Sequence, residues 1–140
     1  MKNIMMMGML FLGITYAVSI TTEVVVDSKT KLEWQNQAIN KIKQVNWLDA
    51  IDYCENLDLD GKSDWRLPDI TELTSLVDYS VSEPAIVSTL QDRTTNAIYW
   101  SSTTYFKSTD KAYFVTFEHG FSSYELKSVD YFSVRCVRDN

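Results

Sequence analysis

Residues 46–77, NWLDAIDYCENLDLDGKSDWRLPDITELTSLV, contain two helix-start signals separated by a loop. Asn46 can cap a first helix, because amide side chains accept hydrogen bonds from the free N–H groups of a first turn. The apolar residues after it recur at helical spacing: Trp47, Ala50, Ile51, Cys54 and Leu57. Asp69 with Glu72 three residues later has the form of a capping box. A short apolar stripe follows: Ile70, Leu73, Leu76 and Val77. The stretch therefore predicts two helices, the first with Cys54 on its buried face.

Strand-like segments lie upstream of these helices, and a weakly patterned segment follows them. The β-branched run 23–27 and the alternating run 31–35 are joined by turn residues, which predicts a hairpin with Leu32 and Trp34 buried. The stretch 80–97 has mixed polarity and no clear period. We expect a long loop there, with one helical turn around 86–90.

The last third of the chain is dominated by strand patterns. The predicted strands cover residues 98–105, 111–117, 121–126 and 131–138. Glu118-His119-Gly120 forms a predicted turn between the second and third of them. Alternation in the last strand places Phe132, Val134 and Cys136 on one face. Helices followed by an antiparallel sheet predict an α+β fold.

The net charge of −6, from 13 basic and 19 acidic residues, argues against nucleic acid as a partner. Phosphate contacts dominate nucleic-acid affinity, and binders of this class carry a basic patch. Here the basic residues are scattered along the chain. The same reasoning disfavours an anionic membrane surface.

The N-terminus has the order of charged, apolar and small residues that is typical of a secretory signal peptide. Lys2 supplies the positive charge, and residues 5–17 are mostly apolar. That stretch is shorter than the roughly 20 apolar residues of a membrane span. We predict a signal peptide at 1–19 and a mature domain at 20–140, periplasmic or secreted, without stable membrane insertion after cleavage. An uncleaved anchor or a buried first strand is the alternative.

The chain has two cysteines, Cys54 and Cys136. In an exported protein an even count predicts pairing, and these two are the only possible partners. Such a bond closes a loop of roughly 80 residues and stabilises the fold by about 4–5 kcal/mol. Two buried free thiols are the alternative.

Five segments together resemble a bacterial domain family, first catalogued without a function and named for the C-terminal domain of the Legionella collagen-like protein, Lcl. The segments are DSKTKLEWQ at 27–35, WLDAIDYC at 47–54, GKSDWRLPDITEL at 61–73, YWSST at 99–103 and VRCVR at 134–138. Each is weak alone, but they occur in the family's order over nearly the whole mature chain.

The resemblance implies a C-type-lectin-like fold, with two helices packed on a small twisted antiparallel sheet. It also implies that the termini meet as neighbouring strands and that one disulfide joins the first helix to the last strand. The named member is an adhesin that binds sulfated glycosaminoglycans. We do not carry that ligand over, because an acidic domain without a basic stripe suits sulfated chains poorly.

No metal, cofactor or catalytic site is predicted. Glu83-Pro84 resembles the start of a calcium-lectin motif, but Ala85 follows it and no Trp-Asn-Asp occurs. A more distant relative generates formylglycine with reactive thiols, which a disulfide would remove. His119, the single histidine, lies in the predicted turn without a nucleophile. Trp65 and Trp100 have apolar neighbours and are expected in the core rather than against a sugar.

The loops are the expected place for binding. Candidate ligand-binding residues are Asp92, Asn96, Tyr105, Lys107, Asp110 and His119. The alternative for each is an ordinary solvated loop residue. The sequence thus predicts an exported, non-catalytic recognition or adhesion module that binds a glycan or a cell-surface protein. A structural subunit of a cell-envelope assembly is the second hypothesis, and an enzyme like the formylglycine-generating one is the third.

Overall fold

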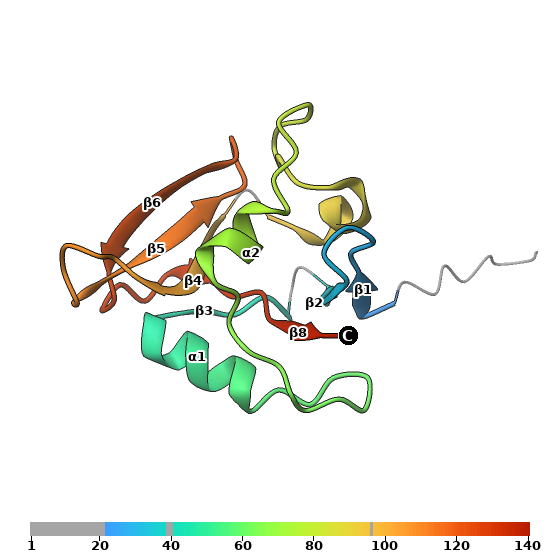
Figure 1. Cartoon of the computed structure of the whole chain (residues 1–140), viewed down its shortest axis with the longest axis horizontal. Helices are drawn as coiled ribbons and strands as arrows, with labels where there is room; N and C mark the ends of the chain where they lie inside the picture. Colours follow the sequence, from blue (N-terminus) through green and yellow to red (C-terminus); the bar gives the residue numbers. More distant parts are fainter. Residues whose placement is uncertain (1–21, 39–40, 96) are drawn as a thin grey trace, which may run out of the picture.

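A computed structural model describes residues 22–38, 41–95 and 97–140 of the chain. The predicted signal peptide at 1–19 lies outside the described residues. Within them, no helix has both the length and the apolar character needed to cross a membrane. The described residues form two small sheets and two short α-helices. Figure 1 shows the C-terminus beside the first strands.

The first sheet brings the two ends of the domain together. It contains β1 (Val24–Val26), β2 (Leu32–Gln35) and β8 (Val137–Asp139) in the order β1-β2-β8, all antiparallel. The predicted hairpin is confirmed; of the two residues expected to be buried, Trp34 is fully buried and Leu32 is partly buried. The Asp27 carboxylate accepts hydrogen bonds from the backbone of the turn. Because β2 pairs with β8, the expectation that terminal strands are neighbours is also confirmed.

The second sheet has five strands in the order β3-β7-β4-β5-β6. Their bounds are β3 Gln44–Val45, β4 Ile98–Thr104, β5 Lys111–Thr116, β6 Phe121–Leu126 and β7 Phe132–Ser133. The predicted strands of the last third are confirmed in β4, β5 and β6. Two-residue β3 was not predicted, since so short a segment shows no periodicity.

The expectation of one antiparallel sheet is wrong in two respects. There are two sheets, and β4 pairs with β7 in parallel at Tyr99 and Ser133. The predicted strand 131–138 is divided into β7 and β8, and between them the Gln35 side chain accepts the Cys136 N–H at 2.9 Å. The chain therefore leaves the second sheet after β7 and enters the first as β8.

Both helices begin where their caps predict. In α1 (Trp47–Glu55) the Asn46 side chain accepts from the Asp49 N–H, and α2 (Ile70–Thr74) has the complete Asp69/Glu72 capping box. Leu76 and Val77 lie beyond the end of α2, so the apolar stripe is longer than the helix. A 3₁₀ helix, η2 (Ser88–Arg93), begins two residues after the start of the predicted helical turn.

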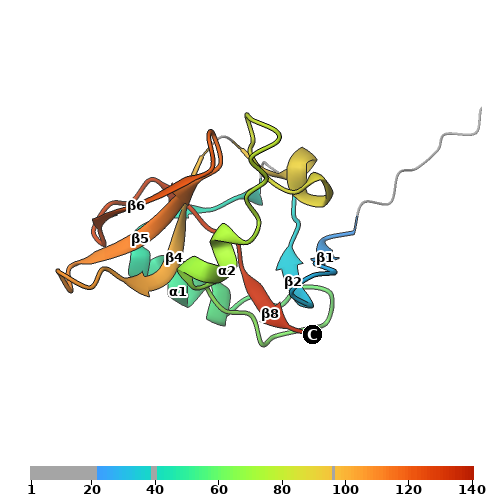
Figure 2. The same cartoon turned by 45° about the horizontal axis from the view of Figure 1, so that its top comes forward.

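The helices lie on opposite faces of the five-stranded sheet (Figure 2). On one face, Ala50 and Cys54 of α1 belong to a core with Trp100 and Phe114. On the other, Leu73 of α2 belongs to a core that contains Tyr99 of β4, Val115 of β5 and Phe117, directly after β5. Successive strand residues alternate between faces, so β4 and β5 supply both cores.

The predicted disulfide between Cys54 and Cys136 is confirmed, with Cα atoms 5.5 Å apart. It joins α1 to the segment between β7 and β8. Both cysteines are fully buried. In the chain-entropy view, closing a loop with a sequence separation of 82 residues destabilises the unfolded chain.

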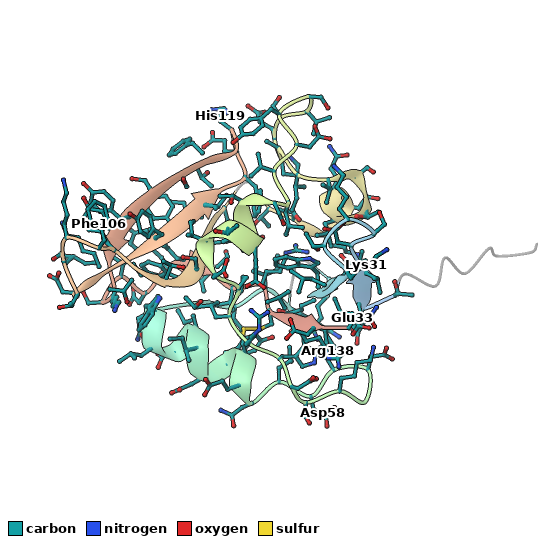
Figure 3. All side chains as sticks on the ribbon, viewed as in Figure 1. Lys31, Glu33, Asp58, Phe106, His119 and Arg138 are labelled. Carbon is teal, nitrogen blue, oxygen red and sulfur yellow. A yellow bond between two sulfur atoms is a disulfide. The ribbon has the colours of Figure 1, made fainter. Side chains whose placement is uncertain are left out.

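A chain of ion pairs fixes the loop between the helices. Glu33 on β2 is buried and accepts hydrogen bonds from Lys62, at 2.8 Å, and from Arg138 on β8. Figure 3 shows Glu33 and Arg138 side by side. The lysine hydrogen bond lowers the pKa of Glu33; burial opposes this, and Arg138 adds to it. In the same loop, Arg66 donates to both oxygens of Glu72, each at 2.7 Å.

Candidate binding surface

The part of the five-stranded sheet that α2 leaves uncovered has an aromatic surface. Cross-strand pairing places Tyr113 of β5 beside Tyr124 of β6. Tyr105, directly after β4, completes the group together with its neighbour Phe106. We call these four residues the tyrosine platform. Phe106 is 76% exposed and Tyr124 is 41% exposed, so much of the platform faces solvent.

The platform is held together by ring contacts. Tyr105 stacks on Tyr124 with centroids 3.8 Å apart and planes 14° apart. Tyr113 meets both rings edge-on, with centroids at 5.4 Å and 6.4 Å. Such pairs contribute about 0.5–1.5 kcal/mol each beyond their burial, so the rings fix one another's orientation.

Two lysines border the platform. The Lys111 Nζ lies 5.4 Å from the Tyr124 ring centroid, and the Lys107 Nζ lies at the same distance from the Phe106 centroid. Both contacts are within the range of cation–π attraction. A hydrogen bond with Tyr124 raises the pKa of the Tyr105 phenol. That phenol stays neutral at physiological pH and can both donate and accept.

The turn between β4 and β5 is closed by polar contacts. Asp110 accepts a hydrogen bond from the Ser108 hydroxyl, which lowers the pKa of Asp110. The carbonyl of Asp110 accepts from the Lys127 N–H at 2.9 Å. The turn is thereby fixed to the segment that follows β6.

A pocket of about 470 Å³ adjoins this turn on the other side of Lys127. The Lys127 Nζ lies 3.9 Å from the Trp47 ring centroid and donates to the Thr104 hydroxyl at 2.8 Å. Leu48, 65% exposed, contributes apolar surface. The first turn of α1 and the β4–β5 turn lie at the same end of the molecule (Figure 1). Their aromatic rings and lysines are therefore presented at that end.

The predicted ligand-binding residues do not form a single site. Tyr105, Lys107 and Asp110 lie together in the β4–β5 turn. His119 is exposed in the turn at the opposite end of β5, and Figure 3 shows it far from Phe106. Asp92 is exposed on η2.

Other sequence expectations meet the structure as follows. Asn96 lies outside the described residues. Trp65 and Trp100 are 2% and 0% exposed, which confirms their assignment to the core. Glu83-Pro84, the dipeptide that resembles the start of a calcium-lectin motif, has a cis peptide bond. The backbone N–H of the following residue, Ala85, donates to the Phe117 carbonyl.

Sequence reasoning missed three of the four platform residues, Phe106, Tyr113 and Tyr124, and the pocket beside the platform. Tyr113 and Tyr124 fall in predicted strands, but the sequence pattern does not show which face of the sheet a helix covers. A usable signal existed: a turn at 118–120 fixes the β5–β6 register, and that register puts the two tyrosines opposite each other. For Trp47 and Lys127 no sequence signal exists, because 80 residues separate them.

The chemistry available to this surface is stacking, hydrogen bonding and charge. Over 22–38, 41–95 and 97–140, no three His, Cys, Asp or Glu side chains group as metal ligands. Both cysteines are in the disulfide. The His119 Nε2 lies 3.9 Å from a Glu118 oxygen, and both side chains are largely exposed.

These features define a small, disulfide-bonded α+β domain that presents an aromatic and lysine-rich end. The chain belongs to the Lcl C-terminal domain family, whose model matches residues 23–138. That match confirms the resemblance seen in the five sequence segments. No curated protein matches the chain.

Proposed function

We propose that this protein is an exported, non-catalytic recognition module that binds a glycan on a cell or matrix surface. The tyrosine platform is the observation that supports the proposal most strongly. We also propose that the fold is C-type-lectin-like. Helices on opposite faces of the larger sheet, neighbouring terminal strands and the Cys54–Cys136 bond support that assignment.

Aromatic rings that stay exposed and ordered suit the apolar C–H face of a sugar ring. Tyrosine gives a large rigid surface with a polar hydroxyl, at low cost in side-chain entropy. Stacking between Tyr105 and Tyr124 fixes both rings before a ligand arrives, which reduces the ordering penalty on binding. Exposed Phe106 extends this surface.

The polar groups around the rings would set orientation. Lys107 and Lys111 can donate to hydroxyl or carboxylate oxygens, and the neutral phenol of Tyr105 can donate or accept. Lys127 brings a third ammonium group to the same end of the molecule. A few polar groups around an apolar surface are the usual composition of a ligand site.

A glycan array probed with the purified protein tests the proposal. We expect binding to at least one glycan class and a loss of tenfold or more in Tyr124→Ala. Tyr79→Ala is the matched control, because Tyr79 is 80% exposed but lies outside the platform. Binding equal in wild type and Tyr124→Ala, or no binding to any glycan, would contradict the proposal.

A second candidate function is that of a structural subunit in a cell-envelope assembly. Strand β6 favours it, since this edge strand carries exposed Phe121 and Leu126 and contains neither Lys nor Pro. Co-purification of one stoichiometric protein from envelope fractions, lost in Ser123→Pro but kept in Tyr124→Ala, would favour this function over glycan binding.

Export is part of the proposal and has its own measurement. Mass spectrometry of the protein from cells should show cleavage near Ile20 and no free thiol on Cys54 or Cys136. Disulfide bonds form and persist in oxidising compartments such as the periplasm or the cell exterior. Two free thiols in the native protein would remove that support and reopen a thiol-dependent enzyme as a hypothesis.

A further inference from the structure

Arg135, in the segment between β7 and β8, is a buried cation without a counter-charge. Its side chain is 3% exposed. The ion pairs of the described residues leave it without a carboxylate partner. No Asp or Glu occurs outside those residues, since 1–21, 39–40 and 96 contain none. An unpaired buried charge is costly, and arginine stays protonated.

Neutral acceptors satisfy part of the guanidinium. Its Nη1 donates to the Gln35 carbonyl at 3.1 Å, and its Nη2 donates to the Arg93 carbonyl at 2.7 Å and the Thr94 hydroxyl at 2.8 Å. The Tyr99 ring lies 5.8 Å from its central carbon. The Nε atom, buried as well, has no hydrogen-bond partner among residues 22–38, 41–95 and 97–140. One strong donor of a buried cation is therefore unused.

A small cavity lies beside this side chain. It has a volume of about 10 Å³ and is lined by Gln35, Gln37, Ile42, Val134 and Arg135. This is room for about one particle of the size of a water molecule. A sulfate or a carboxylate group is too large for it, whereas a halide ion is close to that size.

The cavity has a polar neighbourhood and a route to solvent. Gln37 and Ile42 also line an open pocket of about 390 Å³, together with Lys41, Lys43 and Tyr53. The Gln37 carbonyl oxygen is engaged by Gln35, at 2.7 Å. Its amide NH₂ group can therefore turn a donor toward an anion. Lys43 gives the entrance positive charge, whereas Lys41 is paired with Glu23 at 3.2 Å.

We propose that this cavity is a binding site for one small monovalent anion, with chloride as the physiological ligand. The Nε of Arg135 and the Gln37 amide are its donors. The ion neutralises the buried guanidinium and stabilises the segment that carries Cys136. The site is separate from the tyrosine platform, and the proposal does not depend on what the platform binds.

Thermal unfolding of the disulfide-bonded protein at constant ionic strength, with chloride replaced stepwise by gluconate, whose carboxylate is too large for the cavity, tests this. Binding to the folded state alone raises Tm with ligand concentration. We expect a rise of roughly 5 °C for each tenfold increase in chloride above its dissociation constant. Excess broadening of the ³⁵Cl NMR line should report the bound ion directly.

Gln37→Glu is the decisive variant. It keeps the oxygen that Gln35 bonds and places a carboxylate beside Arg135, so the chloride dependence of Tm and the ³⁵Cl broadening should both disappear. Gln44→Glu adds the same charge at an exposed position and should retain both. Arg135→Met should also lose both, and Gln37→Glu carries the test if Arg135→Met does not fold.

Two results would overturn the proposal. The first is a Tm that depends equally on chloride in the wild type and Gln37→Glu, since that dependence would be a general salt effect. The second is an absence of chloride dependence and of ³⁵Cl broadening in the wild type, which would leave a water molecule in the cavity. Comparison between variants in the same two salts separates ion binding from any general effect of the salts on stability.

Discussion

The same face of the five-stranded sheet carries aromatic residues at both ends of β5, and the two ends differ in what lies over them. At one end, Tyr99 and Phe117 are 0% exposed beneath α2 and the segments after it. At the other, Tyr113 and Tyr124 have no helix above them. Their residue types and strand positions are alike, so the covering segment decides which rings form core and which form a surface.

The covered end also depends on close backbone packing. Gly120 ends the turn between β5 and β6 with φ +77°, and a Cβ there would lie 2.5 Å from the Val77 side chain. The 77–86 segment can therefore pack against the turn only because position 120 has no side chain. The uncovered end has no such constraint, and its rings are held by one another.

The largest expected effect separates the two ends directly. Phe117→Ala removes a fully buried ring that packs edge-on against Tyr99, at 5.3 Å between centroids. We expect a loss of about 3–5 kcal/mol in the free energy of unfolding, from lost burial and the cavity left behind. Urea unfolding followed by tryptophan fluorescence measures it. A loss below 1 kcal/mol would mean that this end is not a packed core.

Gly120→Ala tests the close approach at the covered end. Positive φ costs a residue with a side chain about 1–2 kcal/mol, and the overlap with Val77 adds about 1–3 kcal/mol. Gly61→Ala is the matched control, since Gly61 also has a positive φ of +69° but nothing lies within 4 Å of its added Cβ. Equal losses in the two variants would show that packing over Gly120 contributes nothing.

The comparison between buried and exposed positions also applies to ion pairs. Glu33 is buried, whereas Glu23 forms an exposed pair with Lys41. Glu33→Gln should reduce the free energy of unfolding by about 1.5–3 kcal/mol at pH 7, because hydrogen bonds to a buried charge are lost. Glu23→Gln should change it by about 0.5 kcal/mol or less.

The pH dependence of the Glu33 effect has a definite sign. Its pKa is lowered by folding from the ordinary value of 4.5, so its contribution is fully present above that pH. The contribution is lost as the pH falls below 4.5 through the folded-state pKa. The difference between the wild type and Glu33→Gln should therefore narrow in urea unfolding series taken from pH 6 to pH 3. A constant difference would contradict the assignment.

The smallest effect on stability is expected at the platform. Tyr124→Ala should reduce the free energy of unfolding by about 1 kcal/mol or less, because the ring is 41% exposed and loses mainly its stacking on Tyr105. Ligand binding should fall in the same variant. A stability loss near that of Phe117→Ala would place Tyr124 in the core and remove the distinction between the two ends.

Much of the fold could be predicted because its signals are local. Asn46 and the Asp69/Glu72 pair fixed the helix starts through hydrogen bonds that span three residues. Two cysteines left a single intramolecular pairing. The division of the last strand was missed because the contacts made there, such as the hydrogen bond from the Cys136 N–H to the Gln35 side chain, join positions 101 residues apart.

The binding surface could be predicted only in part. Tyr105, Lys107 and Asp110 were found because polar and aromatic residues in a turn between strands point to a loop surface. His119 and Asp92 satisfied the same criterion, yet the structure puts them elsewhere. Residue types alone do not show which turns lie close together in the folded protein.

The sequence by itself determined the helix starts, the strand segments, the disulfide partners and the family, because each depends on residues whose order in the chain is sufficient. Tertiary structure alone decided which tyrosines remain exposed, how Trp47 meets Lys127, and that Arg135 is buried without a carboxylate partner among the described residues. Those properties depend on which distant segment covers a given position. Whether a distant segment covers a given residue depends on how the whole chain packs, and no local sequence pattern encodes it.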